Sequence, residues 1–184
     1  MSLPHYSNDQ TSKKGKNFEP VTGNLFEVTI LPPAGVSGQE MLIQHVKNIN
    51  GLELHKGQDA VAQKFKWSTR SFAGIPADSH VDVTVGFTLN LNEANQMYLY
   101  KTIREWSRLA YNPETGESGL KKDYVGQMVV VQFNRAGDIY RKITLEDCFI
   151  TSAPNPGTDL AYETGDPVDL EVTWRCDTWS EELV

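Results

Sequence analysis

The sequence predicts a mainly β fold of the α+β kind, in which antiparallel sheets form a partly open β-barrel or sandwich. One long amphipathic helix is expected on the outside. Two observations predict this architecture. Several segments alternate apolar and polar residues with a period of two, which is typical of antiparallel strands with one buried face and one solvated face. One further segment changes to a period of about 3.6, the period of a helix.

The composition favours one domain with a core of its own. The chain has 184 residues, of which 39% are hydrophobic and 10% are aromatic. Its net charge is −7 and its pI is about 5.1, which argues against a basic groove that grips nucleic-acid phosphates.

The absence of long apolar segments predicts the compartment of the protein. No apolar run approaches the roughly 20 residues that a membrane helix needs, and residues 1–21 lack the apolar core of a signal peptide. We therefore expect a protein made in a cytosol, with no membrane segment. In such a reducing compartment Cys148 and Cys176 are expected to be free buried thiols.

The first part of the chain reads as a polar arm followed by short strands. Residues 1–22 carry Ser, Asn, Lys and Pro and have no core, so we expect an N-terminal arm. Turn residues, among them Asn50-Gly51, then separate the expected strands. The expected strands are 24–30, 41–49 and 60–69, and the expected loops are 31–40 and 70–79.

The most regular strand, residues 81–91, has two contrasting faces. One face is uniformly apolar, and the other face has small or polar residues only. The apolar set is Val81, Val83, Val85, Phe87, Leu89 and Leu91, and the other set is Asp82, Thr84, Gly86, Thr88 and Asn90.

A helix is expected from near Asn90, which can act as the N-cap with Glu93 three positions later. Leu99, Ile103 and Trp106 form its apolar stripe, and Asn112-Pro113 ends it.

The last part of the chain predicts a hairpin and a closing strand. Residues 126–134 and 138–151 are expected to pair around Gly137, which can adopt a positive φ. Residues 168–179 alternate again. We therefore expect a single domain over 23–180 and a short tail over 181–184.

No constellation of residues indicates catalysis or metal binding. His5, His45, His55 and His80 lack metal-site spacing, and no nucleophile elbow, phosphate-binding loop or dinucleotide motif is present. Glu146 and Asp147 are adjacent in a strand and point to opposite faces, so they cannot work as an acid and base pair. We expect no enzyme activity, no metal and no cofactor.

Several motifs, taken in order, resemble one known family. They are "GNLFEVTI", "INGLELHKG", "RSFAG" followed by "VDVTVGFTLN" and a helix with "REW", the hairpin "VVVQFNRAGDIYRKITLEDCFITSAPN", and "VDLEVTWRCDTW". This order is similar to that of the tail tube proteins of contractile-tailed bacteriophages. Related tubes occur in phage-like contractile injection particles and in type VI secretion. The resemblance covers about residues 24–179.

The resemblance implies a structural virion protein without enzyme activity. Six subunits would form a ring whose sheets join into one barrel, and the stacked rings would form the tube through which phage DNA passes into the host. The implied partners are other copies of the chain, a tail sheath protein, baseplate and tail-terminator proteins, and DNA in passage without specific binding. The protein would be made in the bacterial cytoplasm and reside in the tail of the virion.

The resemblance also assigns roles to residues. Small and acidic side chains would keep the channel open and repel DNA phosphates. The expected channel lining is Asp82, Thr84, Gly86, Thr88 and Asn90, and the expected core under the helix is Val83, Val85, Phe87, Leu89, Leu99, Ile103 and Trp106. The candidates for ring-to-ring contact are Phe18, Leu52, Glu53, His55, Phe72 and Ile75, and those facing a sheath are Lys101, Arg104, Glu105 and Arg108.

Other functions stay open at this point. The chain could form the tube of an injection particle that carries protein effectors, or a baseplate or tail-end ring that initiates or caps a tube. A monomeric β-barrel that binds a ligand is a further alternative. In a monomeric sandwich, the polar set on residues 81–91 would simply face water.

Overall fold

The computed structural model describes residues 21–55, 57–74, 79–89, 98–153 and 168–184. Seven strands form one antiparallel sheet in the order β1-β6-β7-β8-β5-β2, with β9 paired to β7, and two more strands form a separate hairpin. The elements are β1 (Phe26–Leu31), α2 (Gln39–Gln44), β2 (Val46–Asn50), β3 (Ala60–Lys64), β4 (Thr69–Ala73), β5 (Val81–Thr88), α3 (Tyr98–Ala110), α4 (Lys121–Tyr124), β6 (Gly126–Phe133), β7 (Ile139–Ser152), β8 (Asp169–Cys176) and β9 (Thr178–Leu183).

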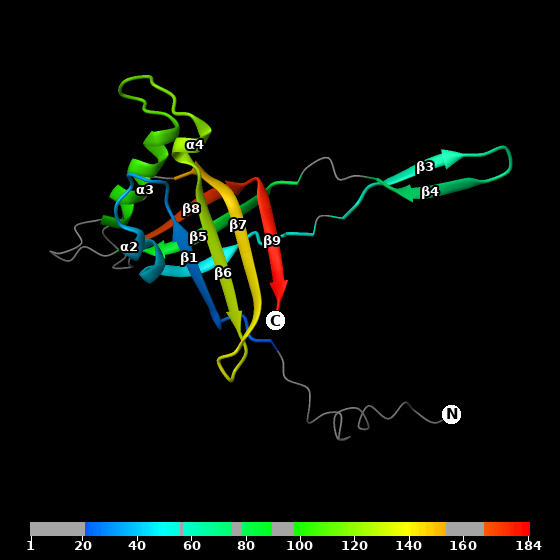
Figure 1. Ribbon diagram of the computed structural model, residues 1–184, viewed down its shortest axis with the longest axis horizontal. Helices are drawn as coiled ribbons and strands as arrows, with labels where there is room; N and C mark the ends of the chain where they lie inside the picture. The colour runs from blue at the N-terminus through cyan, green and yellow to red at the C-terminus, as the bar shows by residue number, and fades with distance from the viewer. Residues whose placement is uncertain (1–20, 56, 75–78, 90–97, 154–167) are drawn as a thin grey trace, which may run out of the picture.

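The long strand β7 folds the sheet into two layers. Its first half pairs with β6 and β9, and its second half pairs with β8. The layer of β1, β6, β7 and β9 therefore lies over the layer of β8, β5 and β2, whose strands run across it (Figure 1). This arrangement is a sandwich, and the described strands do not close into a barrel.

The bend in the sheet lies at Asp147 and Asp177. Asp147 has a positive φ of 53°, and Asp177 is the single residue between β8 and β9. Lys121 donates to the carboxylates of Asp147, at 3.4 Å, and of Asp177, and these contacts raise the pKa of Lys121, the hydrogen bond to Asp177 most strongly.

The expectation of two free thiols is wrong. Cys148 and Cys176 form a disulfide at this bend, with their Cα atoms 4.0 Å apart. The pairing of β7 with β8 places the two residues directly opposite each other on neighbouring strands. Such a pairing depends on the register of two strands, which the sequence does not reveal.

The core lies between the two layers and under the helices. The alternating apolar residues of both layers meet there, and Trp106 and Trp174 are fully buried at its centre, with ring centroids 6.0 Å apart. The layer of β1, β6 and β7 contributes Val28, Ile30, Met128, Val130, Ile143 and Leu145, and the layer of β5 and β8 contributes Val81, Val83, Val85, Phe87, Leu170, Val172 and Trp174.

Helix α3 covers part of this core with the stripe that its sequence predicts. Leu99, Ile103 and Trp106 are buried, and the Trp106 Nε1–H donates to the carbonyl of Tyr124 at 2.7 Å. The helix ends at Ala110, just before the predicted stop. The predicted start at Asn90 and its partner Glu93 lie outside the described residues, and the described part of this helix has 13 residues.

The predicted strands are confirmed at β1, β5 and β8 and in the β6–β7 hairpin, where Gly137 adopts the expected positive φ of 91°. The expected strand over 41–49 is wrong in its first half, which belongs to the short helix α2. Tertiary packing explains this helix, because its own residue Leu42 is fully buried in the core. The loop expected over 70–79 contains β4 instead, and β9 was not expected beyond residue 179.

Candidate assembly surfaces

The polar face of β5 continues onto β8, the neighbouring strand. Asp82 lies opposite Arg175, Thr84 opposite Thr173, Gly86 opposite Glu171 and Thr88 opposite Asp169. We call these eight residues the polar face. Asp82 is exposed, Thr84 and Thr88 are half-buried, and Gly86 is buried. The fifth predicted lining residue, Asn90, lies outside the described residues.

Most charges on the polar face are paired with an opposite charge. Arg175 donates two hydrogen bonds of 2.8 Å to the two carboxylate oxygens of Asp82. Lys47 of β2 bonds Asp169, which also accepts a hydrogen bond from Thr88, and the bond from Lys47 is the main reason why the pKa of Asp169 is lowered. Among the described residues, Glu171 forms no ion pair. The face is therefore a mixture of hydroxyls and compensated charges, and less acidic than its β5 residues suggest.

Gly86 gives the polar face room for a neighbouring side chain. A Cβ at this position would lie 2.0 Å from Asn48 Oδ1, because the Asn48 side chain of β2 lies over the glycine. The Thr84 and Thr173 hydroxyls are 3.0 Å apart and bond each other across the two strands. No side chain on β5 therefore projects far from this face, apart from the Asp82 carboxylate that Arg175 holds.

The residues expected under the helix lie on the opposite face of β5. Val83, Val85 and Phe87 are fully buried, and Leu89 is half-buried against the same core.

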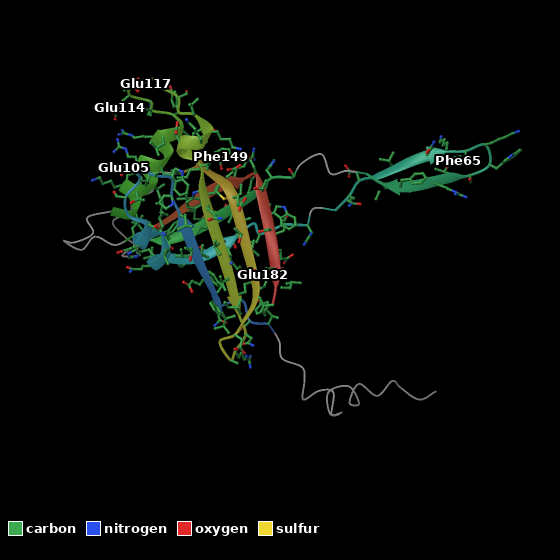
Figure 2. All side chains as sticks on the ribbon, viewed as in Figure 1. Phe65, Glu105, Glu114, Glu117, Phe149 and Glu182 are labelled. Atoms are coloured by element: carbon green, nitrogen blue, oxygen red, sulfur yellow. A yellow bond between two sulfur atoms is a disulfide. The ribbon has the colours of Figure 1, made fainter. Side chains whose placement is uncertain are left out.

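The β3–β4 hairpin projects from the sandwich, on the side away from α2 and α3 (Figure 1). Every residue of its two strands is exposed. One face and the turn carry large apolar side chains, with the Arg70 guanidinium 5.9 Å from the centre of the Phe65 ring. Figure 2 shows Phe65 on this arm, far from the body of the protein. The exposed apolar residues of the arm are Val61 (57%), Phe65 (48%), Trp67 (88%) and Phe72 (50%).

Four of the candidates for ring-to-ring contact lie in the β3–β4 hairpin or in the segment that precedes it. Phe72 is exposed on β4. Leu52 is half-buried and Glu53 is exposed, and both lie in the segment between β2 and β3, which we call the strap. His55 lies in the same strap, where its ring packs edge-on against Trp179 and its Nε2 lies 3.0 Å from Glu181 Oε2. Phe18 and Ile75 lie outside the described residues.

Glu181 of β9 anchors the strap to the body. Its other oxygen accepts a hydrogen bond from Arg141 of β7. The bonds from His55 and Arg141 lower the pKa of Glu181, with that from His55 the larger cause. The sequence could not indicate this anchor, because His55 and Glu181 are 126 residues apart.

The candidates for sheath contact lie on α3, but the structure adds a residue that the sequence analysis missed. Lys101 and Glu105 form an ion pair along the helix, with Nζ and Oε1 4.0 Å apart. Arg104 and Arg108 both contact Glu114, which belongs to the loop after the helix. Glu105, Glu114 and Glu117 lie along one flank of the molecule in Figure 2.

Within the described residues, no group of three or more His, Cys, Asp or Glu side chains could hold a metal ion. No helix in the same part of the chain is long and apolar enough to cross a membrane.

The chain is similar to solved structures of contractile injection systems and of a phage tail tube. The chain matches a chain of the sheath–tube complex of an extracellular contractile injection system, PVC, with a TM-score of 0.61 and 15% identity over 95% of this chain and 99% of that chain. It matches the tube-terminating cap of the anti-feeding prophage with a TM-score of 0.62 and 12% identity, over 91% and 93% of the two chains.

A third match is the SPP1 tail tube, with a TM-score of 0.51 and 12% identity over 90% of this chain and 80% of that chain. This chain has the tail tube fold. The resemblance that the sequence motifs indicate is thus confirmed at the level of the fold.

No protein-family model matches the chain, and no curated protein sequence matches it. The likeness to tail tube proteins is therefore carried by the arrangement of the strands and by the ordered motifs.

Proposed function

We propose that this chain is a structural subunit that assembles with copies of itself into rings, and that the rings stack into a hollow tube. The fold shared with tube and cap proteins supports the proposal. The observation that carries it is the β3–β4 hairpin. An isolated two-stranded hairpin is marginally stable in water, and this one exposes four large apolar side chains. A neighbouring subunit would supply the surface that it lacks.

In the proposed ring of six subunits, the edge strands β1 and β2 join the sheets of neighbouring subunits. The polar face then lines the channel, including Asn90, and α3 lies outside. Phe18, Leu52, Glu53, His55, Phe72 and Ile75 contribute to contacts between rings, with the hairpin as the main element.

The charges of the polar face suit a channel through which a polymer slides. The ion pairs of Asp82 with Arg175 and of Asp169 with Lys47 leave few charges free to hold a passing molecule. A ring of six Glu171 carboxylates would add a weak repulsion toward phosphates. We therefore propose passage of phage DNA without specific binding.

The proposed setting is a contractile tail or particle. The tube would be enclosed by a sheath that meets Lys101, Arg104, Glu105 and Arg108, and would end on baseplate and terminator proteins. The subunit would be made in the cytoplasm of a bacterial host, and it would have no enzyme activity.

A second candidate is a ring that caps or starts a tube, because the tube-terminating cap of the anti-feeding prophage matches this chain as well as the sheath–tube complex does. The tube of an injection particle that carries effectors would use the same surfaces.

Negative-stain microscopy with light scattering, over a range of protein concentrations, tests the proposal. Hollow tubes that lengthen with concentration support the tube subunit, and rings that never stack support the cap. A monomer of 20.6 kDa at every concentration, also when seeded with baseplates, would count against both.

A further inference from the structure

A pocket lies between α3 and the loop that follows it. Its volume is about 290 Å³, and Ile103 and Ala153 are among its apolar lining residues. Tyr100 and Tyr111 also line the pocket. Arg104 and Arg108, one helical turn apart, present their guanidinium groups to it. A pocket with apolar walls and two cations on one side suits a ligand with an apolar stem and an anionic end.

The loop places its own carboxylate at these cations. The Asn112 side chain accepts a hydrogen bond of 3.0 Å from the backbone N–H of Glu114. The Asn112 backbone N–H donates to the carbonyl of Glu117, and the Gly116 N–H donates to the carbonyl of Asn112. These bonds fix the loop locally, so Glu114 is held over α3 by backbone geometry as well as by its ion pairs.

One carboxylate cannot satisfy two guanidinium groups. Each arginine offers five N–H donors in a planar fork, and both arginines contact the same oxygen of Glu114, Oε1. Arg108 makes the close contact, while Arg104 lies 3.7 Å from the same oxygen. Among the described residues that line the pocket, Arg104, Arg108 and Glu114 carry a charge. One of the two positive charges therefore has no matching negative charge in the lining. The Glu114 side chain is 66% exposed and can leave into solvent.

We infer that this pocket binds an acidic side chain of a second protein, and that Glu114 occupies the arginines until that carboxylate displaces it. The proposed function gives the partner: the protein that encloses the tube. The pocket opens on the flank of α3, beside the core residue Ile103, whereas the polar face lies on the other side of the sheet. A partner outside the tube therefore meets the pocket, and a molecule in the channel does not.

The exchange replaces one ion pair with another, so its net free energy is small. Exposed ion pairs are individually weak, which suits a contact that has to form and break reversibly. The arginines never lose a partner during the exchange. The second protein can therefore bind without leaving a guanidinium group without a carboxylate.

Removing the competing carboxylate tests the inference. We expect Glu114→Gln to strengthen binding of the peptide N-acetyl-Glu-Ala-Glu-Ala-Glu-amide by roughly fivefold, and Arg108→Gln to weaken it by a similar factor. Lys142→Gln is the matched control: it removes an exposed cation from β7 that does not line the pocket, and should leave affinity nearly unchanged. Isothermal titration at low salt gives the affinities, and circular dichroism checks that each variant is folded.

Two further ligands sharpen the test. The same peptide with Gln in place of Glu should not bind, and inorganic phosphate should compete weakly. Equal affinities of the acidic peptide for all four proteins would overturn the inference, as would equal binding of the Gln peptide. Phosphate that binds as tightly as the peptide would make the pocket a general anion site and would also overturn it.

Failure here can be told apart from failure of the proposed function. Tubes seen by microscopy with no peptide binding would leave the tube proposal standing and remove the inference. A monomer that binds the peptide with the expected order of variants would leave the pocket standing and remove the tube.

Discussion

Gly126 shows how closely single residues are fitted around the helix. A Cβ on Gly126 would lie 2.5 Å from the carbonyl oxygen of Leu31 and 2.7 Å from the Trp106 ring. We expect Gly126→Ala to lower the free energy of unfolding by about 1–3 kcal/mol, because backbone and a buried indole would both have to move. Urea unfolding measures the loss. Gly23→Ala, where a Cβ meets open space, should show no comparable loss, and equal midpoints for the two variants would contradict the account.

Glu181 gives a prediction for pH dependence. Its pKa is lowered in the folded state by His55 and Arg141, so its ionised form stabilises the fold above the pKa of the unfolded chain, about 4.3. This contribution is lost as the pH falls through the lower, folded pKa. Between about pH 6 and about pH 3, wild type should therefore lose more stability than Glu181→Gln.

Urea midpoints at both pH values check this prediction. The control is Glu182→Gln, because Glu182 is exposed on the same strand. It should follow wild type. A Glu181→Gln protein whose acid sensitivity matches wild type would mean that the bonds to His55 and Arg141 contribute nothing measurable.

The buried face of α3 could be predicted from the sequence. The period of α3 places Leu99, Ile103 and Trp106 in the core, because a helical stripe has only one face to bury. The partners of polar side chains could not be predicted. The pairing of Asp82 with Arg175 and the contact of Glu114 with two arginines depend on which segments meet in space.

At the scale of elements, the bend in β7 is held covalently. The disulfide joins residues 28 positions apart on neighbouring strands, at the point where β7 passes from one layer to the other. We expect the Cys148→Ala, Cys176→Ala double variant to be less stable than the oxidised wild type by about 2–4 kcal/mol.

Thermal unfolding with and without reductant separates the disulfide from simple packing changes. The melting temperature of wild type should fall with reductant, and that of the double variant should not change. If reductant leaves the wild-type melting temperature unaltered, the two sulfur atoms do not hold the bend.

The hairpin gives the element-scale prediction for assembly. Replacing Val61, Phe65 and Phe72 with Ser should leave the melting temperature of the isolated subunit nearly unchanged, since all three are exposed. Ring or tube formation should be lost. Light scattering measures assembly, and Leu120→Ser, at an apolar residue 63% exposed elsewhere on the surface, is the control. Normal assembly of the triple variant would remove the hairpin from the proposed contacts.

Elements with a long, regular pattern were predicted well, and short ones were not. β5, β8 and the β6–β7 hairpin have clear alternation and a glycine turn. The six-residue helix α2 is too short to be stable alone and exists because Leu42 packs into the core, which no local pattern reveals. β9 continues the ladder of β7 after a bend at Asp177, and a bend of this kind has no sequence signature.

At the scale of the whole molecule, the subunit has features that a monomer does not need. It has open sheet edges at β1 and β2, a hairpin of exposed apolar residues, and a polar face most of whose charges are paired. The open edges and the exposed apolar residues are liabilities in a solitary sandwich. In the proposed ring, the edges would become joints, the hairpin would contact a neighbouring subunit, and the polar face would become the wall of a channel. We therefore propose that the polar face of β5 and β8 lines the bore of the tube.

Electron cryomicroscopy of the assembled protein, at a resolution that separates strands, tests this claim most directly. The account predicts a hollow cross-section in which Asp82, Thr84 and Thr173 face the lumen and α3 lies on the outer wall. An assembly whose bore is lined by α3, or one in which the polar face is buried between subunits, would contradict it.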